Sequence, residues 1–257
     1  MSNLISKLKD VLLNTYLSPI NNNTRLALSI RNRIMQEMLH LNGSIFAIKR
    51  LINKQDLNNS IIVDVGCFDG NTSIFFSKEF RNVKVIGFEA GKQSYEKALK
   101  NASAYSLIKI ENYAASDHDG VAEFFVTDNK VSSSLNSLSG SDKRFDTEVI
   151  EQVNTISLDS YFKNESLENK NILLIKLDVQ GHEVSVLKGA QSVLQNTSFV
   201  LTEMSNHKSY SGGAQYYEVD RVLRESGFTL HNIFAPYSYG PSLYEFDALY
   251  INSKLIK

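Results

Sequence analysis

The residues with the clearest capacity to bind a ligand form a glycine-containing loop, residues 63–71, after a short apolar run. In this loop Gly66 permits a tight turn, and Gly70 allows close approach of backbone to a ligand where a helix begins. A dinucleotide-binding loop needs three glycines in the pattern G-x-G-x-x-G, but Phe68 stands at the middle position and the third glycine is absent. The loop is therefore expected to hold a ligand without a pyrophosphate, and NAD binding is disfavoured.

A second acidic signal follows the next apolar run. Glu89 lies 23 residues after Gly66, close to the spacing of about 20 residues at which an acid accepts hydrogen bonds from ribose hydroxyls. Together with Asp64 at the foot of the loop, it predicts a ligand with an amino-acid part and a nucleoside part, a description that S-adenosylmethionine fits. A lone carboxylate at a strand end can instead be a helix cap, so the prediction depends on the spacing of the pair.

Polar residues also follow two later apolar runs and are candidates for catalysis. The two groups are Asp178 with Gln180, His182 and Glu183, and Glu203 with Asn206 and His207. Group transfer from such a ligand to an acceptor that loses a proton would need in-line alignment and the help of a base or a metal. Asp178 and Glu203, at neighbouring strand ends, could hold Mg²⁺ through oxygen ligands, and His182 or His207 could instead be the direct base. Two of these residues could instead have structural roles: Asp178 could cap a helix, and Glu183 in the first turn of that helix could interact favourably with the helix dipole.

Aromatic and serine residues are candidates for an acceptor pocket. The tyrosines that concentrate in the last quarter of the chain are Tyr210, Tyr216, Tyr217, Tyr237, Tyr239 and Tyr244. Their flat faces and polar tips suit a sugar or an aromatic acceptor. The serines of residues 132–134 could donate hydrogen bonds to a polyhydroxyl acceptor. Core packing of the tyrosines and a flexible serine loop are the alternative interpretations.

The elements that must position these residues are predicted by the order of apolar runs from residue 61 onwards. Short apolar runs alternate with helix-period segments, which is typical of a parallel sheet covered by helices on both faces. Expected strands are 61–65, 83–88, 107–112, 171–177 and 198–203, and expected helices are 71–79, 92–103, 183–195 and 214–226. A closing antiparallel hairpin is expected from strands 228–233 and 246–251, and an insertion contains a strand at 121–126 and a polar loop at 131–147.

The first 55 residues have a different character from the rest. They carry eight basic and two acidic residues, a net charge of +6 that leaves −7 for residues 56–257. Helical spacing predicts helices over about 4–17, 24–41 and 44–52. We therefore divide the chain into a helical segment, 1–55, and a main domain, 56–257. The basic segment is expected to be a solvated face or a homodimer interface, with contact to an anionic membrane surface as the alternative.

Composition narrows the class of protein. With 257 residues, 42% of them hydrophobic and 21% charged, the chain is an ordinary globule large enough for a sizeable core. A single cysteine, Cys67, excludes an internal disulfide and a thiolate zinc cluster. Because Asp10 and Asn14 interrupt the first leucines and no apolar stretch reaches about 18 residues, we expect no signal peptide, no membrane span and a cytoplasmic location.

Six motifs in this order resemble the FkbM family of S-adenosylmethionine-dependent methyltransferases. They are VDVGCFDGNTS (63–73), GFEA (87–90), AASDHDGVAEF (114–124), SSSL (132–135), TISLDSYF (155–162) and KLDVQGHEVSVLKGA (176–190). The resemblance implies an α/β fold of the class I methyltransferase type, a Rossmann-like seven-stranded mixed sheet with a reversed last hairpin. It also implies O-methyl transfer, often to a sugar or other hydroxylated metabolite.

The same resemblance implies which residues contact the cofactor. Asp64, Gly66 and Gly70 would belong to the methionine-binding loop, Glu89 to the ribose, and Ser116 with Asp117 to the adenine edge. The full set of expected cofactor-binding residues is Asp64, Gly66, Cys67, Phe68, Gly70, Asn71, Thr72, Glu89, Ser116, Asp117 and Asp178. Where the family commonly has Ala-Asn after the first glycine, this chain has Cys67-Phe68, and Cys67 is expected to line the pocket rather than to be a nucleophile.

The leading functional prediction is an O-methyltransferase acting on a hydroxyl of a sugar, glycan or small metabolite. Methylation of a nucleic acid is a less favoured hypothesis, because the main domain has a net charge of −7 and contacts to phosphates need a basic surface. A non-catalytic cofactor-binding module is the other alternative, and such a relic should bind neither S-adenosylmethionine nor its demethylated product.

Overall fold

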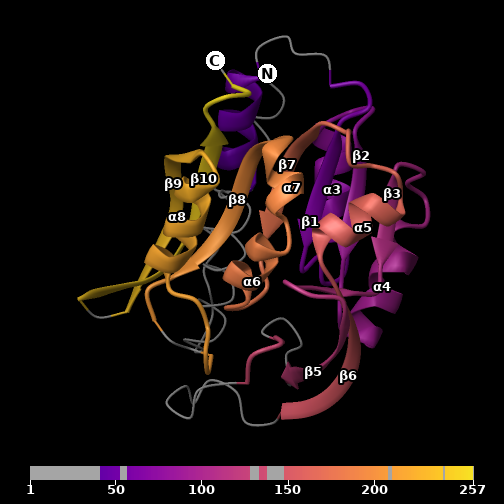
Figure 1. Ribbon diagram of the computed structural model, residues 1–257, viewed down its shortest axis with the longest axis vertical. Helices are drawn as coiled ribbons and strands as arrows, with labels where there is room; N and C mark the ends of the chain where they lie inside the picture. Colours follow the sequence, from indigo (N-terminus) through magenta and orange to yellow (C-terminus); the bar gives the residue numbers. More distant parts are fainter. Residues whose placement is uncertain are drawn as a thin grey trace, which may run out of the picture. The chain divides into compact units, whose positions relative to one another are not determined.

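The computed structural model describes residues 41–52, 57–127, 133–137, 148–207, 210–239 and 241–256. Figure 1 shows these residues arranged as one central sheet with helices on both of its faces. The predicted helices at 4–17 and 24–41, and the predicted roles of the basic segment, fall almost entirely outside the described residues. Within the described residues no helix is both long and apolar enough to cross a membrane.

The central sheet has seven strands in the order β3-β2-β1-β7-β8-β10-β9. In chain order they are β1 (Ile61–Val65), β2 (Lys84–Phe88), β3 (Ile108–Glu111), β7 (Ile172–Leu177), β8 (Thr197–Ser205), β9 (Phe228–Tyr239) and β10 (Ser242–Asn252). Every pairing is parallel except those of β10, which is antiparallel to both β8 and β9. The sheet therefore reverses direction only at its last hairpin, which agrees with the predicted α/β class.

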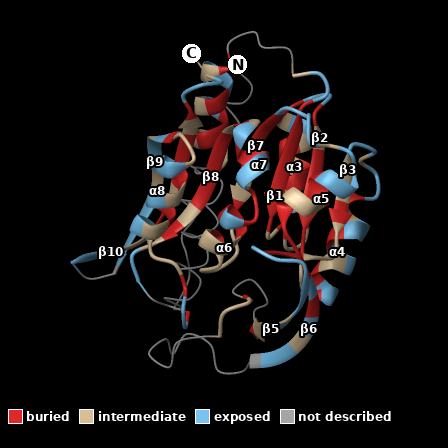
Figure 2. Cartoon of the chain, viewed as in Figure 1, coloured by how far each residue is buried: buried red, intermediate tan, exposed pale blue. Residues whose placement is uncertain are grey.

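Helices cover the two faces of this sheet. One face carries α5 (Leu158–Asn164), α6 (Glu183–Lys188), α7 (Gln191–Gln195) and α8 (Tyr216–Glu225), whose apolar side chains form one core with the inward residues of β1, β7 and β8. The other face carries α3 (Asn71–Glu79) and a helix over residues 41–51, and α4 (Lys92–Ala102) packs beside α3. Figure 2 shows the central strands buried on both faces. Burial on both faces explains why these strands are continuous apolar runs.

Residues 41–52 pack in the same compact unit as the sheet. Ile45, Ile48 and Ile52 are buried in the core that also contains Phe76 of α3 and Leu174 of β7. The boundary predicted at residue 55 therefore falls after a helix that contributes to the core of the main domain.

A smaller sheet of three strands lies against the carboxyl ends of the central strands. Its order is β4 (Ala114–Ala115), β6 (Glu148–Ile156), β5 (Gly120–Thr127), with β6 antiparallel to β5 and parallel to β4. Figure 1 shows β5 and β6 at the lower edge of the molecule. The strand expected at 121–126 is present as β5, but sequence reasoning missed β6 and α5 inside the region treated as an insertion.

One predicted helix is broken in two. The segment expected as a single helix over 183–195 forms α6 and α7, which are separated at Gly189 and Ala190. A side chain at Gly189 would collide with the carbonyl oxygen of Ser116, so this position accepts only glycine. The break thus lets the chain after β4 approach α6 closely.

Candidate functional site

A hollow of about 520 Å³ opens where the central strands end. It is lined by Val65, Gly66, Phe88, Glu89, Ala90, Tyr113, Ala114, Ala115, Phe124, Ser133, Ser134, Leu135, Asp178, Val179 and His182. The loops after β1, β2 and β7 meet here because the carboxyl ends of parallel strands share one edge of the sheet.

Gly66 makes the turn that opens this hollow. Its φ is +77°, a conformation that glycine adopts freely, and a Cβ atom would collide with the carbonyl oxygen of Asp178. Gly70 also has a positive φ, +79°, and lies against Ala98 of α4. Gly66 therefore makes the tight turn that was predicted, whereas Gly70 allows close packing against α4, and its predicted approach to a ligand stays a prediction.

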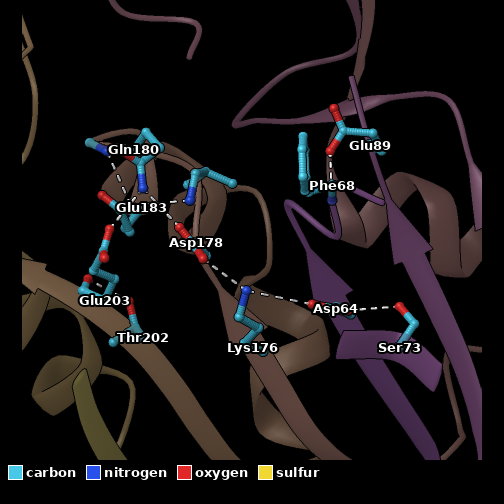
Figure 3. A network of polar contacts seen from close by, with 12 residues as sticks. Asp64, Phe68, Ser73, Glu89, Lys176, Asp178, Gln180, Glu183, Thr202 and Glu203 are labelled. Carbon is cyan, nitrogen blue, oxygen red and sulfur yellow. Dashed lines mark hydrogen bonds and ion pairs between the residues drawn. The ribbon is translucent and has the colours of Figure 1, made fainter. Parts of the chain in front are cut away.

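Glu89 is held in place by the backbone on both sides. Its Oε2 accepts a hydrogen bond from Phe68 N at 2.9 Å, and its Oε1 accepts one from Gly91 N at 2.9 Å. Figure 3 shows this carboxylate beside Phe68. Burial raises the pKa of Glu89 to about 7, against the opposing effect of the two backbone donors. Each oxygen keeps a lone pair for a further donor, which is the geometry that two ribose hydroxyls need.

Asp64 does not face the hollow but lies beneath it. Its Oδ2 accepts a hydrogen bond from Ser73 Oγ at 2.7 Å, and its Oδ1 lies 3.8 Å from Lys176 Nζ. Asp64 is fully buried, and its Oδ1 accepts no hydrogen bond from a described residue. Burial raises the pKa of Asp64, and the charge of Lys176 opposes this rise. Its expected contact with the cofactor would therefore have to be indirect.

Lys176 connects this acid to the candidate catalytic one. Its Nζ donates a hydrogen bond to Asp178 Oδ2 at 3.0 Å (Figure 3), and its side chain is 13% exposed. Burial disfavours the charge of Lys176, but the two aspartates more than offset this effect and raise its pKa. Sequence reasoning missed this residue, although a lysine inside the apolar strand β7 was a signal that it needed a partner.

Asp178 and Glu203 are brought together by the side chain of Gln180. Gln180 Nε2 donates to Asp178 Oδ1 at 2.9 Å and to Glu203 Oε2 at 2.9 Å (Figure 3), and Tyr210 Oη donates to Gln180 Oε1 at 2.8 Å. Burial raises the pKa of Glu203 well above its ordinary value, and the charge of Asp178 adds to the rise. The two strand-end acids thus meet as expected, but through an amide.

The two candidate histidines lie in different places. His182 lines the first hollow, where its Nε2 is 3.0 Å from Ser116 Oγ, and burial lowers its pKa to about 4. His207 is exposed and stacks on Tyr244, with ring centroids 5.0 Å apart. The structure therefore places His182 with the expected adenine-edge residue Ser116, and only His207 near Glu203. Asp117, the neighbour of Ser116, is paired with His118 at 2.6 Å.

A second hollow of about 350 Å³ adjoins the first on the side of Glu203. It is lined by Gln180, Gly181, Glu183, Glu203, Ser205, His207, Tyr210, Gly213, Ala214 and Glu245. Tyr237 contacts Tyr244 edge-on at 6.0 Å and so extends the aromatic surface beside it. Buried Glu183 accepts hydrogen bonds from Val179 N and Gly181 N and holds the loop between the two hollows.

The serine segment forms part of the rim of the first hollow. Ser134 Oγ donates to Val179 O at 3.3 Å and to Gln180 O at 2.9 Å, and its backbone pairs with Phe125 of β5. Ser133 Oγ accepts a hydrogen bond from Thr127 N at 3.2 Å. Ser132 lies outside the described residues.

Eight of the eleven expected cofactor-binding residues do not line the hollow: Asp64, Cys67, Phe68, Gly70, Asn71, Thr72, Ser116 and Asp117. The side chain of Cys67 is 3% exposed and packs with Ala98, Ala102 and Ile110, so the expectation that it lines the pocket is wrong. Its position beneath the turn directs the thiol toward α4, and burial raises its pKa well above the ordinary value. Asn71 and Thr72 belong to the first turn of α3 and also lie outside the lining.

The arrangement does not favour the predicted Mg²⁺ site. Within the described parts of the chain, no group of three or more histidine, cysteine, aspartate or glutamate side chains is placed to hold a metal ion. The space between Asp178 and Glu203 contains an amide nitrogen, which is a donor rather than a ligand. We therefore derive no step through a metal.

The strand order, with one antiparallel strand next to the edge, is that of a Rossmann-like methyltransferase of class I. A family model described as the methyltransferase FkbM domain matches residues 64–230. The chain therefore belongs to the FkbM methyltransferase family. It is an S-adenosylmethionine-dependent methyltransferase, as the motifs predicted.

Two relatives are about one-quarter identical to this chain over the aligned residues. The 2-O-methyltransferase NoeI of Sinorhizobium fredii is 26% identical over 176 residues, 64% of this chain and 71% of that protein. The hexuronic acid methyltransferase AglP of Haloferax volcanii is 26% identical over 178 residues, 69% of this chain and 66% of that protein. Among solved structures, the magnesium protoporphyrin IX methyltransferase of Synechocystis with bound S-adenosylmethionine has a TM-score of 0.48 at 11% identity, covering 96% of each chain.

Proposed function

We propose that this protein transfers the methyl group of S-adenosylmethionine to a hydroxyl of a sugar or glycan. The observation that carries the proposal is the position of Asp178. It lines the first hollow and is connected through Gln180 to Glu203, which lines the second. A carboxylate between a cofactor hollow and an acceptor hollow is where O-methyl transfer needs its base.

The first hollow fits the cofactor in three respects. Glu89 presents two oxygens that backbone donors already orient, which suits two ribose hydroxyls. Tyr113, Phe124 and Leu135 offer apolar surfaces for an adenine ring, with Ser116 and His182 at its edge. Gly66 lines the hollow without a side chain at the turn where the amino-acid end would lie.

When bound, S-adenosylmethionine supplies a methyl group already activated by its sulfonium. The residues of this chain then have two tasks, which are to align the acceptor oxygen and to take its proton. Asp178 is the proposed base, because Lys176 stabilises its ionised form and its side chain is 37% exposed. The acceptor oxygen forms the new bond to the methyl carbon as the carbon–sulfur bond breaks, and its proton passes to Asp178. Glu203 would accept or donate a hydrogen bond to the acceptor.

The second hollow suits a sugar. Glu203, Ser205, Glu245 and Tyr210 supply groups that exchange hydrogen bonds with hydroxyls, and the stacked rings of His207 and Tyr244 supply a flat apolar face. The name of one relative, a hexuronic acid methyltransferase, supports a carbohydrate acceptor. Tyr239 ends β9, and Tyr216 and Tyr217 begin α8 at some remove from these groups.

The proposal is tested by a screen of acceptors with a tritium-labelled methyl donor, divided between glycans, phenolics and RNA. We expect label in the glycan fraction and calorimetric binding of S-adenosylhomocysteine. Label only in phenolics or RNA would refute the sugar assignment, and no binding of either form of the cofactor would refute the enzyme assignment.

The remaining expectations concern the surroundings of the enzyme. A cytoplasmic location, a homodimer and contact of residues 1–55 with the inner face of a membrane stay predictions. Their support is the net charge of +6 in that segment. Size-exclusion chromatography with light scattering and co-sedimentation with anionic vesicles test the last two.

A further inference from the structure

The side chain of Gln180 occupies an unusual position between two acids. Its amide nitrogen lies 2.9 Å from Asp178 Oδ1 and 2.9 Å from Glu203 Oε2. A primary amide has two N–H donors, and here one donor is directed at each carboxyl group. Because the two acids are otherwise neighbours on adjacent strand ends, this nitrogen fills the space in which a bridging cation would have to sit.

The rest of the residue is fixed by its surroundings. Tyr210 Oη donates to the amide oxygen at 2.8 Å, so the oxygen points toward the tyrosine and the nitrogen toward the acids. The backbone carbonyl accepts a hydrogen bond from Ser134 Oγ at 2.9 Å. The φ of Gln180 is +53°, a left-handed conformation that costs free energy in a non-glycine residue and is kept only where the surroundings determine it.

The charges around the two acids are mostly of the same sign. The groups that face them are Lys176 on β7, Asp64 on β1, Glu89 on β2, Glu183 on α6, and Glu245 with Asp247 on β10. Lys176 is directed at Asp178 Oδ2 and Asp64 Oδ1. Among these groups and Gln180, the hydrogen-bond donor to the Glu203 carboxyl group is the Gln180 amide.

We infer that Gln180 is a positioning residue that takes the place of a bridging metal ion, holding Asp178 toward the acceptor hydroxyl and keeping Glu203 beside it. This inference rests on the proposed function, in which Asp178 is the base. One carboxylate is thereby stabilised by a cation and an amide, and the other by an amide only. The two acids therefore differ in their surroundings, and Asp178 is the one assigned to take the proton.

The kinetic test replaces Gln180 with methionine, which has a similar length and no donor. We expect kcat at pH 7 to fall about tenfold or more, since hydrogen bonds to charged groups are lost, while the Kd of S-adenosylhomocysteine changes by less than about twofold. The acid limb of the kcat profile should move to higher pH by about one unit, because a carboxylate without its donor ionises less readily. The matched control is Gln152→Met, on the exposed surface of β6.

A milder variant guards against misfolding. Tyr210→Phe removes only the hydroxyl that orients the amide, and it should shift the acid limb in the same direction by a smaller amount. Unchanged kcat and unchanged pH profiles in both variants would overturn the inference.

A second test, for metal binding, does not require the enzyme to turn over a substrate. Mg²⁺ is titrated calorimetrically into the full-length protein saturated with S-adenosylhomocysteine, and into its Asp178→Asn variant. We expect the two titrations to be the same, with no saturable binding that Asp178 supports. Saturable binding of Mg²⁺ that Asp178→Asn abolishes would overturn the inference, whether or not a sugar acceptor has been found. Failure of the proposed function would instead appear as wild-type protein that methylates no glycan.

Discussion

Replacing Glu89 with glutamine tests the cofactor site through a change of a few atoms. In the structure both oxygens of Glu89 accept backbone hydrogen bonds, from Phe68 N and from Gly91 N. A glutamine has one oxygen, so its NH₂ group must face one of these two N–H donors. The variant therefore loses one backbone hydrogen bond and also one acceptor for a ribose hydroxyl.

The size of the effect follows from this arrangement. A hydrogen bond to a charged group contributes about 1.5–3 kcal/mol, which corresponds to a factor of roughly 13 to 160 in affinity. Because one ribose hydroxyl keeps its acceptor, we expect the Kd of S-adenosylhomocysteine to rise about 10- to 100-fold for Glu89→Gln. The buried N–H left unpaired at Phe68 or Gly91 should also lower the free energy of unfolding by about 1–3 kcal/mol.

Isothermal titration calorimetry at pH 8 measures the affinity, and urea unfolding measures the stability. The matched control is Glu96→Gln, an exposed residue on α4, for which both quantities should stay within error of the wild type. A folded Glu89→Gln variant that binds S-adenosylhomocysteine within twofold of the wild type would refute the assignment of Glu89 to the ribose.

Three further outcomes are expected. The pKa of Glu89 is raised to about 7, so the ionised form that accepts hydrogen bonds becomes dominant as pH rises. Calorimetry should therefore find that wild-type protein binds S-adenosylhomocysteine up to about tenfold more weakly at pH 6 than at pH 8. The Glu89→Gln variant should not show this pH dependence. In urea unfolding, Gly66→Ala should lower the free energy of unfolding by about 4 kcal/mol or more, because the new Cβ collides with the carbonyl oxygen of Asp178. Gly212 has a similar φ of +76° but open space around it, so Gly212→Ala should lower the free energy of unfolding by only about 1–2 kcal/mol. Equal losses in the two variants would contradict the steric argument. The pKa of His182 is lowered to about 4, so His182 is a poor base at neutral pH. His182→Ala should therefore raise the KM for S-adenosylmethionine several-fold and leave kcat within about twofold of the wild type. A fall in kcat without a change in KM would show that His182 is the base after all.

Much of the cofactor site could be predicted from the sequence because its signals are local. The turn at Gly66 follows an apolar strand directly, and the distance to Glu89 is the length of one helix and one strand. A buried parallel strand is a continuous apolar run, so β1, β2, β7 and β8 could be located within a residue or two.

The elements that sequence reasoning missed lack such signals. The strand β6 exposes Ile150, Gln152 and Asn154 on one face, so its composition resembles a loop, and its partner β5 lies more than 20 residues earlier in the chain. Pairing over that distance depends on tertiary contacts rather than on local preference. The break between α6 and α7 similarly depends on the carbonyl oxygen of Ser116, which is more than 70 residues away in sequence.

The polar contacts beneath the site show why residue type alone did not reveal its arrangement. Asp64 was predicted at the foot of the glycine loop, and Asp178 and Glu203 were predicted as a pair at neighbouring strand ends, yet their behaviour depends on what lies between them. Lys176 separates the first pair and Gln180 the second, so that three acids share one cation and one amide. The buried charge of Lys176 must be paired to be tolerated, and Asp178 and Asp64 are the acids that pair with it. Since the same lysine also faces Asp64 beneath the glycine loop, the residues that hold the cofactor and the proposed base depend on one shared charge.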